Sequence, residues 1–287
     1  MSKKRRSKAG AIMLVFAAGM LVLIFACRKS VQDIPPQEIN ESSYVDLITV
    51  HILDVLSNSQ LPEHISGNIQ ENMAESPDFI FELFTILQKD PFLWKLVDKK
   101  NSLGSGYEPY DLVDLRSGSY GVVSNRMLRR AAYNSLQEMQ DAARSERLTL
   151  TVLSAYRSHL YQGRVYTYNV ITMGQKEADR ESARPGYSQH QLGLAADFNS
   201  LENAFAKTPE GIWLANNASR FGWSLSYPDG YEDVTGYMWE SWHYRYVGKE
   251  LTGFIDNYFD GIQQYALQFI HNIDERLDRE NLTLGWH

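Results

Sequence analysis

Residues 186 to 197 read G-Y-S-Q-H-Q-L-G-L-A-A-D and constrain the fold more than any other segment of the chain. It holds one imidazole, His190, and one carboxylate, Asp197. Successive side chains of a strand point to opposite faces, so two residues an odd number of positions apart cannot share a face of one continuous strand. The segment is therefore predicted to turn or bulge, with a strand over residues 192–199.

A second segment, W-E-S-W-H-Y-R-Y at residues 239–246, repeats this pattern with Glu240 and His243. These two would share a face only on a helix, but their aromatic neighbours favour a loop that enters a strand. Two imidazoles and one carboxylate suit a tetrahedral catalytic zinc whose fourth position stays open for water. His190, Asp197 and His243 are the candidate ligands, and Glu240 is the candidate general base. Gly193 is expected to let the backbone approach this metal site closely.

The alternative is that these are ordinary residues. An isolated His-Asp pair at this spacing would be a metal site in only about one case in ten, because both residue types are common in loops. The joint pattern is much rarer, since it needs S-x-H, a glycine three residues later, A-x-D, and a downstream E-x-W-H. The other histidines have no such neighbours: His51, His64, His159, His271 and His287.

With these motifs the chain resembles the VanY-type zinc D-alanyl-D-alanine carboxypeptidases of peptidase family M15, with the related L,D-carboxypeptidases. The matching pieces occur in the family's order and span roughly residues 90 to 258. They are S-A-Y-R-S at 154–158, P-G-Y-S-Q-H-Q-L-G-L-A-A-D-F at 185–198, F-G-W at 221–223 and W-E-S-W-H-Y-R-Y-V-G at 239–248.

The resemblance implies a role for each matching residue. His190, Asp197 and His243 match the Zn2+ ligands and Glu240 matches the catalytic base. Arg157 matches an arginine that meets the terminal carboxylate of the substrate, which a planar guanidinium can grip with two parallel bonds. Without the resemblance, a surface salt bridge would be the favoured reading of Arg157. Two weaker matches imply substrate contacts by Gln162 and Ser188.

One position departs from the family, which often has proline where this chain has Ser241. Proline would fix φ and stiffen the loop, so serine is expected to loosen the position of Glu240 slightly without abolishing activity.

Strand and helix patterns alternate without regular βαβ spacing, which predicts an α+β fold. The resemblance implies a small mixed or antiparallel sheet flanked by helices, as in Hedgehog and D,D-peptidase domains. Further strands are expected at 148–153, 223–227 and 243–247, and helices at about 161–176 and 209–220. We predict a linker over 31–43, a helical region over 44–105, a zinc carboxypeptidase domain over 106–258, and a C-terminal helix and tail over 259–287.

The amino terminus predicts export. Lys3, Lys4, Arg5, Arg6 and Lys8 precede an uncharged apolar run from Ala9 to Ala26. Residues 1–30 therefore form a signal anchor or a lipoprotein signal, with the basic cluster kept inside and the catalytic domain extracellular at a bacterial cell membrane. Cys27 follows a small residue, as in a lipoprotein cleavage site, but Phe25 is bulky there, so an uncleaved anchor is favoured at about three to two.

Composition agrees with a folded, exported enzyme. The 287 residues are 44% hydrophobic and 22% charged, which excludes a disordered chain. One cysteine excludes a disulfide within the chain. Without residues 1–30, which carry seven basic residues and no acid, the formal net charge falls from -7 to -14, which argues against a nucleic-acid partner. Nothing in the sequence decides the oligomeric state.

Rival functions have weaker support. A serine D,D-peptidase needs S-x-x-K and K-T-G motifs, and a cysteine transpeptidase needs a catalytic thiol beyond the apolar run. A silent zinc-containing wall-binding module should have lost its base, yet Glu240 is present. The expected function is therefore removal of the C-terminal D-Ala from peptidoglycan stem peptides, and L,D-carboxypeptidase action on tetrapeptide stems is the nearest alternative.

Overall fold

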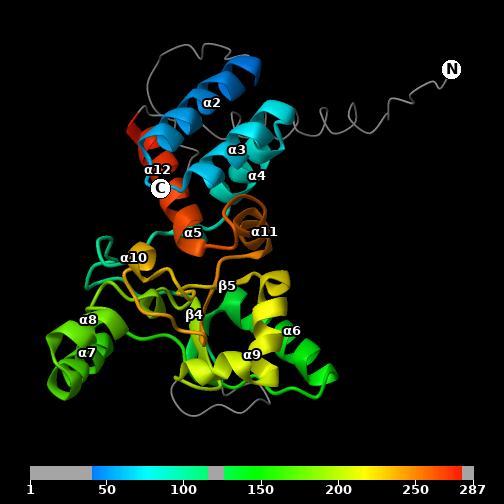
Figure 1. Ribbon diagram of the computed structural model, residues 1–287. Helices are drawn as coiled ribbons and strands as arrows, with labels where there is room; N and C mark the ends of the chain where they lie inside the picture. Colours follow the sequence, from blue (N-terminus) through cyan, green and yellow to red (C-terminus); the bar gives the residue numbers. More distant parts are fainter. Residues whose placement is uncertain (1–40, 116–125, 280–287) are drawn as a thin grey trace. The chain divides into compact units, whose positions relative to one another are not determined.

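The computed structural model describes residues 41–115 and 126–279 (Figure 1). They fall into two compact units. One holds α2 (Glu41–Asn58) with residues 272–279, and the other runs from Gln60 to His271. The apolar run Ala9–Ala26 and Cys27 lie outside the described residues. Within the described ranges, no helix combines the length and apolar character that a bilayer span requires.

The second unit contains a four-stranded antiparallel sheet. Its order is β3-β4-β6-β5, and the strands are short: β3 (Val152–Ser154), β4 (Ala195–Phe198), β5 (Trp223–Leu225) and β6 (His243–Tyr246). A separate hairpin joins β1 (Leu112–Asp114) to β2 (Met127–Arg129). Together with the surrounding helices, this arrangement confirms the α+β prediction with an antiparallel sheet.

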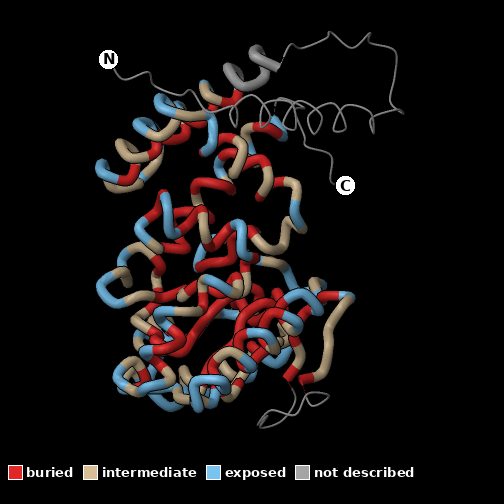
Figure 2. The backbone as a smooth tube through the Cα atoms, turned by 90° about the vertical axis from the view of Figure 1, so that its right-hand side faces the viewer, coloured by how far each residue is buried: buried red, intermediate tan, exposed pale blue. Residues whose placement is uncertain are grey.

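Side-chain alternation gives the sheet one apolar and one polar face. Phe198, Trp223 and Tyr244 lie on the apolar face, where the Phe198 ring centroid is 5.9 Å from that of Trp223 and 6.1 Å from that of Tyr244. They share one core with the inner sides of α6 (Arg130–Ser145) and α9 (Pro209–Asn217). Figure 2 shows buried residues along the inner segments of the chain and exposed ones along the outer segments. The paired residues Asp197 and His243 lie on the other face.

Helices before the sheet pack on a helix that follows it. These are α3 (Glu63–Glu75) and α4 (Asp78–Leu87), which both contact α11 (Lys249–Tyr258), while the short α5 (Pro91–Trp94) contacts α4. Phe79 of α4 lies with its ring centroid 5.0 Å from that of Phe254 and 4.8 Å from that of Tyr258. Aromatic pairs at this spacing stabilise a contact beyond the area they bury.

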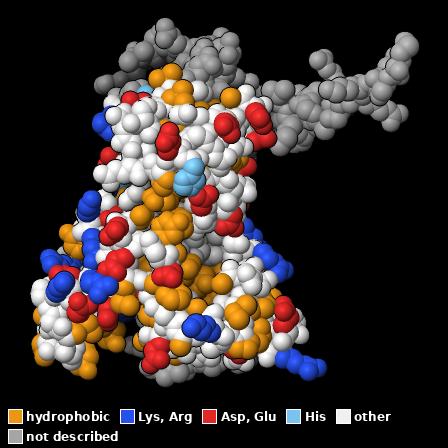
Figure 3. Space-filling view, in the orientation of Figure 1, with side chains coloured by type: hydrophobic (Ala, Val, Ile, Leu, Met, Phe, Trp, Pro, Cys, Tyr) orange, Lys and Arg blue, Asp and Glu red, His pale blue; other side chains and the backbone are white. Residues whose placement is uncertain are grey.

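The helix predicted at about 161–176 is two helices, α7 (His159–Met173) and α8 (Gln175–Glu181). Ser158 caps α7, and Gly174 ends it with a φ of 85°, a conformation that glycine adopts without strain. Basic and acidic side chains are intermixed where this pair lies (Figure 3), and Arg180 of α8 pairs there with Glu232 of α10 (Glu232–Thr235). The last helix, α12 (Gln263–Arg279), occupies most of the predicted C-terminal helix.

Candidate metal centre and active-site pocket

His190 and Asp197 reach the same point because the chain turns between them. His190 lies in a 3-10 turn, η2 (Gln189–Leu192), which Ser188 caps, and Asp197 lies in β4. Gly193 ends the turn with a φ of 69°. The predicted turn between His190 and Asp197, required by their odd spacing, is thereby confirmed.

Gly193 does not serve a close approach of the backbone to the metal site, so that prediction is wrong. A Cβ at this position would lie 2.9 Å from Leu112 Cδ2 and 3.1 Å from Arg129 Cγ, which are atoms of the β1-β2 hairpin. Glycine is needed because the hairpin packs against this backbone and because φ is positive, and the metal site is not the close neighbour.

His243 begins β6, directly opposite Asp197 of β4. Glu240 precedes it in a loop, where the His243 N–H donates to the Glu240 carbonyl at 3.2 Å and the Glu240 N–H donates to the Tyr227 carbonyl at 3.0 Å. The prediction of a loop that enters a strand is confirmed. The four side chains are nearly inaccessible, with exposed fractions of 1% for His190, 7% for Asp197, 12% for Glu240 and 5% for His243.

The donor atoms of His190, Asp197 and His243 lie within 4.8 Å of one another. His190 Nε2 is 3.3 Å from Asp197 Oδ2, and His243 Nδ1 is 3.0 Å from Asp197 Oδ1. Two of these atoms, His190 Nε2 and Asp197 Oδ1, are buried with no hydrogen-bond partner. Buried polar atoms without a partner are costly, so lone pairs that converge on one point fit a bound cation.

The proton of His190 is placed by its neighbour. Its Nδ1 lies 2.7 Å from the Ala155 carbonyl oxygen, which can only accept a hydrogen bond. Nδ1 therefore carries the proton and Nε2 presents a lone pair to the centre. Metal-binding histidines are commonly oriented in this way by a partner of the second ring nitrogen.

Burial and mutual charge shift the pKa values of this group. Burial, together with the Arg157 charge, lowers the pKa of His190 to about 4, so the ring is neutral. Burial raises the pKa of Asp197, but the two imidazoles outweigh it and hold that pKa well below the ordinary value. A neutral imidazole and an ionised carboxylate are the forms that bind a metal.

Glu240 is in a different environment from Asp197. Burial first, and then the negative charge of Asp197, raise the pKa of Glu240 well above its ordinary value. Its Oε2 lies 3.5 Å from His243 Nδ1, at the edge of the donor set. When two carboxylates in one pocket have pKa values shifted in opposite directions, they commonly have different roles. Here Asp197 suits a metal ligand and Glu240 suits an acid and base.

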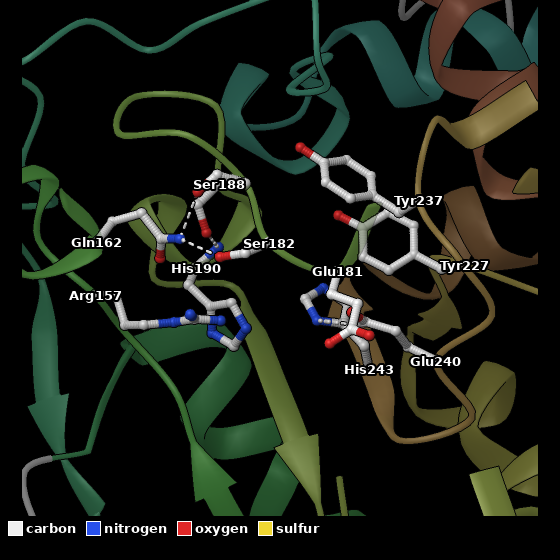
Figure 4. A pocket seen from close by; sticks show the side chains of 11 residues that line it. Arg157, Gln162, Glu181, Ser182, Ser188, His190, Tyr227, Tyr237, Glu240 and His243 are labelled. Carbon is white, nitrogen blue, oxygen red and sulfur yellow. Dashed lines mark hydrogen bonds and ion pairs between the residues drawn. The ribbon is translucent and has the colours of Figure 1, made fainter. Parts of the chain in front are cut away.

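The pocket opens over this centre (Figure 4). Arg157 lines it, with its side chain 18% exposed, its Nε buried without a partner, and its Nη2 3.9 Å from Asp197 Oδ2. That ion pair is long, so the guanidinium keeps donors for an anionic ligand. The surface salt bridge considered from sequence does not describe this side chain. The lining residues are Arg157, Gln162, Glu181, Ser182, Ala183, Ser188, His190, Tyr227, Tyr237, Glu240 and His243.

Gln162 and Ser188 also line the pocket, and both have structural partners. Gln162 Nε2 donates to the Ala183 carbonyl at 2.7 Å, while its Oε1 is buried without a partner. Ser188 Oγ accepts from the His190 N–H at 3.3 Å. The amide of Gln162 therefore holds the backbone at Ala183, and the hydroxyl of Ser188 shapes the turn that carries His190. Their substrate contacts stay predictions.

The structure adds residues that sequence reasoning missed. The Tyr227 ring is tilted against the rings of His243 and Tyr237, with a centroid distance of 4.8 Å in each pair, and Figure 4 shows both tyrosine hydroxyls directed toward the pocket. Burial raises the pKa of both, so both hydroxyls keep their protons and can donate. The only sign of Tyr227 in the sequence was its position at the end of the strand predicted over residues 223–227. Nothing local marks Tyr237.

Asn203 was also missed, and it corrects the expectation for Ser241. Asn203, the first residue of η3 (Asn203–Lys207), accepts from the Ser241 N–H at 3.0 Å and donates to the Trp239 carbonyl at 2.8 Å. The loop that carries Glu240 is therefore held by an amide clamp. Serine is compatible with this clamp because it keeps the backbone N–H that proline would remove.

A buried His-Asp-His donor set beside a buried glutamate defines the class of site as that of a zinc hydrolase. A family model described as VanY, D-alanyl-D-alanine carboxypeptidase, matches residues 125–249. YodJ, a putative carboxypeptidase of Bacillus subtilis (strain 168), is 35% identical over 187 residues, which cover 62% of this chain and 68% of that protein. A D-alanyl-D-alanine carboxypeptidase of Enterococcus faecalis (strain ATCC 700802 / V583) is 32% identical over 214 residues, 69% of this chain and 76% of that protein.

Solved structures agree. The LdcB LD-carboxypeptidase superposes with a TM-score of 0.55 at 34% identity, over 60% of this chain and 84% of that one. VanYB in complex with D-alanine-D-alanine superposes with a TM-score of 0.52 at 30% identity, over 62% of this chain and 98% of that one. VanY of a VanB-type resistance cassette in complex with Zn(II) superposes with a TM-score of 0.51 at 29% identity, over 62% of this chain and 99% of that one. This chain belongs to the VanY family of D-alanyl-D-alanine carboxypeptidases, and it is a zinc carboxypeptidase.

Proposed function

We propose that the enzyme removes the C-terminal D-Ala from peptidoglycan stem peptides, with His190, Asp197 and His243 as the zinc ligands. The observation that carries this proposal is the convergence of three buried donors beside Glu240 in a pocket that Arg157 lines. Bound zinc supplies a Lewis acid that makes water a stronger nucleophile and polarises the scissile carbonyl.

Arg157 binds the substrate's terminal carboxylate. Its donors face the pocket 3.9 Å from Asp197, and a guanidinium matches the two oxygens of a carboxylate. This contact selects a free C-terminus, which makes the reaction that of a carboxypeptidase, and it sets the distance from the terminus to the bond that is cut.

Glu240 moves the proton. Its carboxylate takes a proton from the attacking water at Oε2 and passes it to the amine that leaves. The raised pKa of Glu240 supports this role, because a carboxylate with a raised pKa takes a proton from water more readily than an exposed one does. The hydroxyls of Tyr227 and Tyr237 keep their protons and can donate to the carbonyl oxygen as charge develops on it.

A second activity, L,D-carboxypeptidase action on tetrapeptide stems, has a specific observation in its favour, because LdcB, an LD-carboxypeptidase, is among the superposing structures. We rank it second because the matching family model and the relative from Enterococcus faecalis are both described as D-alanyl-D-alanine carboxypeptidases. A silent wall-binding module ranks last, because Glu240 lies in the pocket.

We further propose that the enzyme acts at the outer face of a bacterial membrane. Support comes from Lys3 to Lys8 and the apolar run that follows, together with the acidic remainder of the chain. Replacing Cys27 by alanine distinguishes the two kinds of tether. A lipoprotein would be released or stay unprocessed, and an anchored protein would remain in the membrane fraction at an unchanged mass.

The experiment that tests the activity incubates the purified full-length chain, in mild detergent, with muramyl pentapeptide or tetrapeptide, with and without a chelator. Mass spectrometry identifies the released amino acid, and the Glu240→Gln chain, purified in parallel, controls for contaminating peptidases. Chelator-sensitive D-Ala from pentapeptide supports the proposal. Release from tetrapeptide alone supports the L,D activity, and no release from a zinc-loaded chain supports the silent module.

A further inference from the structure

We propose that two buried glutamines, Gln189 and Gln263, form an amide relay that fixes the proton of His243 on Nε2 and aims its Nδ1 at the metal centre. This inference rests on the proposed function, in which His243 is a zinc ligand. Gln263 is the first residue of α12, beyond the residues that the family model matches. The relay therefore makes the start of α12 part of the support of the metal site.

A backbone carbonyl fixes the orientation of the Gln263 amide at one end of the relay. Gln263 Nε2 donates to the Ser224 carbonyl at 3.2 Å, and a carbonyl oxygen can only accept. The amide nitrogen of Gln263 must therefore face β5, which leaves its Oε1 facing Gln189. Gln263 is 1% exposed, so water cannot substitute for these partners.

The orientation of Gln263 determines that of Gln189, which in turn determines the protonated nitrogen of His243. Gln263 Oε1 accepts from Gln189 Nε2 at 3.4 Å, so the Oε1 of Gln189 faces the other way. There it accepts from Ser226 Oγ at 2.7 Å and lies 3.3 Å from His243 Nε2. An amide oxygen has no proton to give, so His243 Nε2 must carry one and Nδ1 presents the lone pair.

This tautomer is the one that the site needs. His243 Nδ1 lies 3.0 Å from Asp197 Oδ1, on the side of the donor set. His190 has the opposite arrangement, since its Nδ1 faces the Ala155 carbonyl and its Nε2 faces the centre. A backbone carbonyl orients one imidazole directly, whereas the other depends on side chains. Partners of this kind typically change metal affinity by roughly 10–100-fold when they are removed.

Gln263 is a positioning residue, and the chain supplies a matched control for it. The next residue, Gln264, is also a buried amide of α12, but its Nε2 donates to Asp98 Oδ2 at 2.9 Å and it takes no part in the relay. Replacing either glutamine by leucine removes one buried amide from the same helical turn. Only Gln263→Leu removes the group that orients Gln189.

The test measures the zinc dissociation constant of the full-length chain, in mild detergent, by competition with a chromogenic chelator. We expect Gln263→Leu to raise that constant by roughly 10–100-fold and Gln264→Leu to leave it within about threefold of wild type. The visible spectrum of the Co(II)-substituted chain should change in the first variant alone. Equal constants for the two variants would overturn the relay.

A measurement on the unmodified chain covers the case in which Gln263→Leu does not fold. Long-range 1H–15N correlation spectra of the zinc-loaded, 15N-histidine-labelled chain report which nitrogen of each ring is protonated. We expect His243 to be protonated on Nε2 and His190 on Nδ1. Protonation of His243 on Nδ1 overturns the inference. If wild type binds no zinc, the zinc assignment has failed, whereas a wild type that binds zinc with equal constants for both variants rejects only the relay.

Discussion

At the scale of single residues, His190 gives the protein a sensitivity to acid. Its pKa is lowered from 6.5 to about 4 by burial, so the unfolded chain binds a proton at a higher pH than the folded chain does. Between these values the unfolded state holds more protons, and the free energy of unfolding falls as pH falls from about 6.5 toward 4. Melting temperatures of the chelator-treated chain should decline across this window.

His190→Asn is the control for that decline, since it removes the titrating ring. The slope of melting temperature against pH should be smaller in the variant over the same window. An equal slope in both chains would mean that other groups cause the acid sensitivity.

Glu240 lies beside the donor set rather than within it, so a substitution can distinguish a general base from a metal ligand. Glu240→Gln keeps the shape of the side chain but cannot accept a proton. We expect kcat to fall by roughly 10²–10⁴, the usual contribution of a general base, while zinc content by elemental analysis stays at the wild-type level. Loss of zinc from this variant would identify Glu240 as a ligand instead.

At the scale of elements, η3 holds the catalytic loop in place. Asn203 bonds to the backbone on both sides of Glu240, at Trp239 and Ser241. Asn203→Ala should free the loop and lower kcat by about 10- to 100-fold with little change in KM, because small displacements of a reacting group are costly.

Asn217→Ala is the matched control for the clamp. Asn217 Nδ2 also donates to a tryptophan carbonyl, that of Trp213, at 2.8 Å, but it lies on α9 away from the pocket. Its replacement should leave both kinetic constants near wild type. If both variants lose kcat equally, the effect belongs to general stability and the clamp has no special role.

The contrast between the ligands and Asn203 shows what sequence could predict. His190, Asp197, Glu240 and His243 stand in two short segments, so their spacing restricts the backbone and even requires the turn before β4. Asn203 contacts the loop that carries Glu240, and Tyr237 lines the pocket, but the local sequence around each carries no sign of this, because only tertiary packing brings them there. Gln263 is hidden for the same reason, since its helix reads as an ordinary amphipathic one.

Helix boundaries show a related limit. The pattern after Tyr161 continues through Gly174, and it predicts one helix where the chain forms α7 and α8. The backbone turns there at a positive φ, which a glycine permits but does not require. By contrast, the α+β class followed from strand and helix spacing over the whole domain, and single boundaries matter little to it.

At the scale of the whole molecule, a bound metal should contribute directly to stability. Three buried donors from η2, β4 and β6 are brought together only in the folded chain, so zinc binds the native state in preference to the unfolded one. Free zinc at 100 times its dissociation constant would add about 2.7 kcal/mol to the free energy of unfolding. For a domain of this size, that corresponds to a melting temperature higher by about 5–10 °C.

Calorimetry of the full-length chain checks this value, because a chelator should lower the melting temperature and added zinc should restore it. A reductant should change nothing, since Cys27 is the only cysteine in the chain and no disulfide can form within it. Glu240→Gln should keep the chelator effect, because Glu240 is not needed to complete the donor set, and His190→Asn should lose most of it. A wild-type melting temperature that stays unchanged while zinc is removed would mean that the site forms without the metal, so that core burial alone holds the donors together.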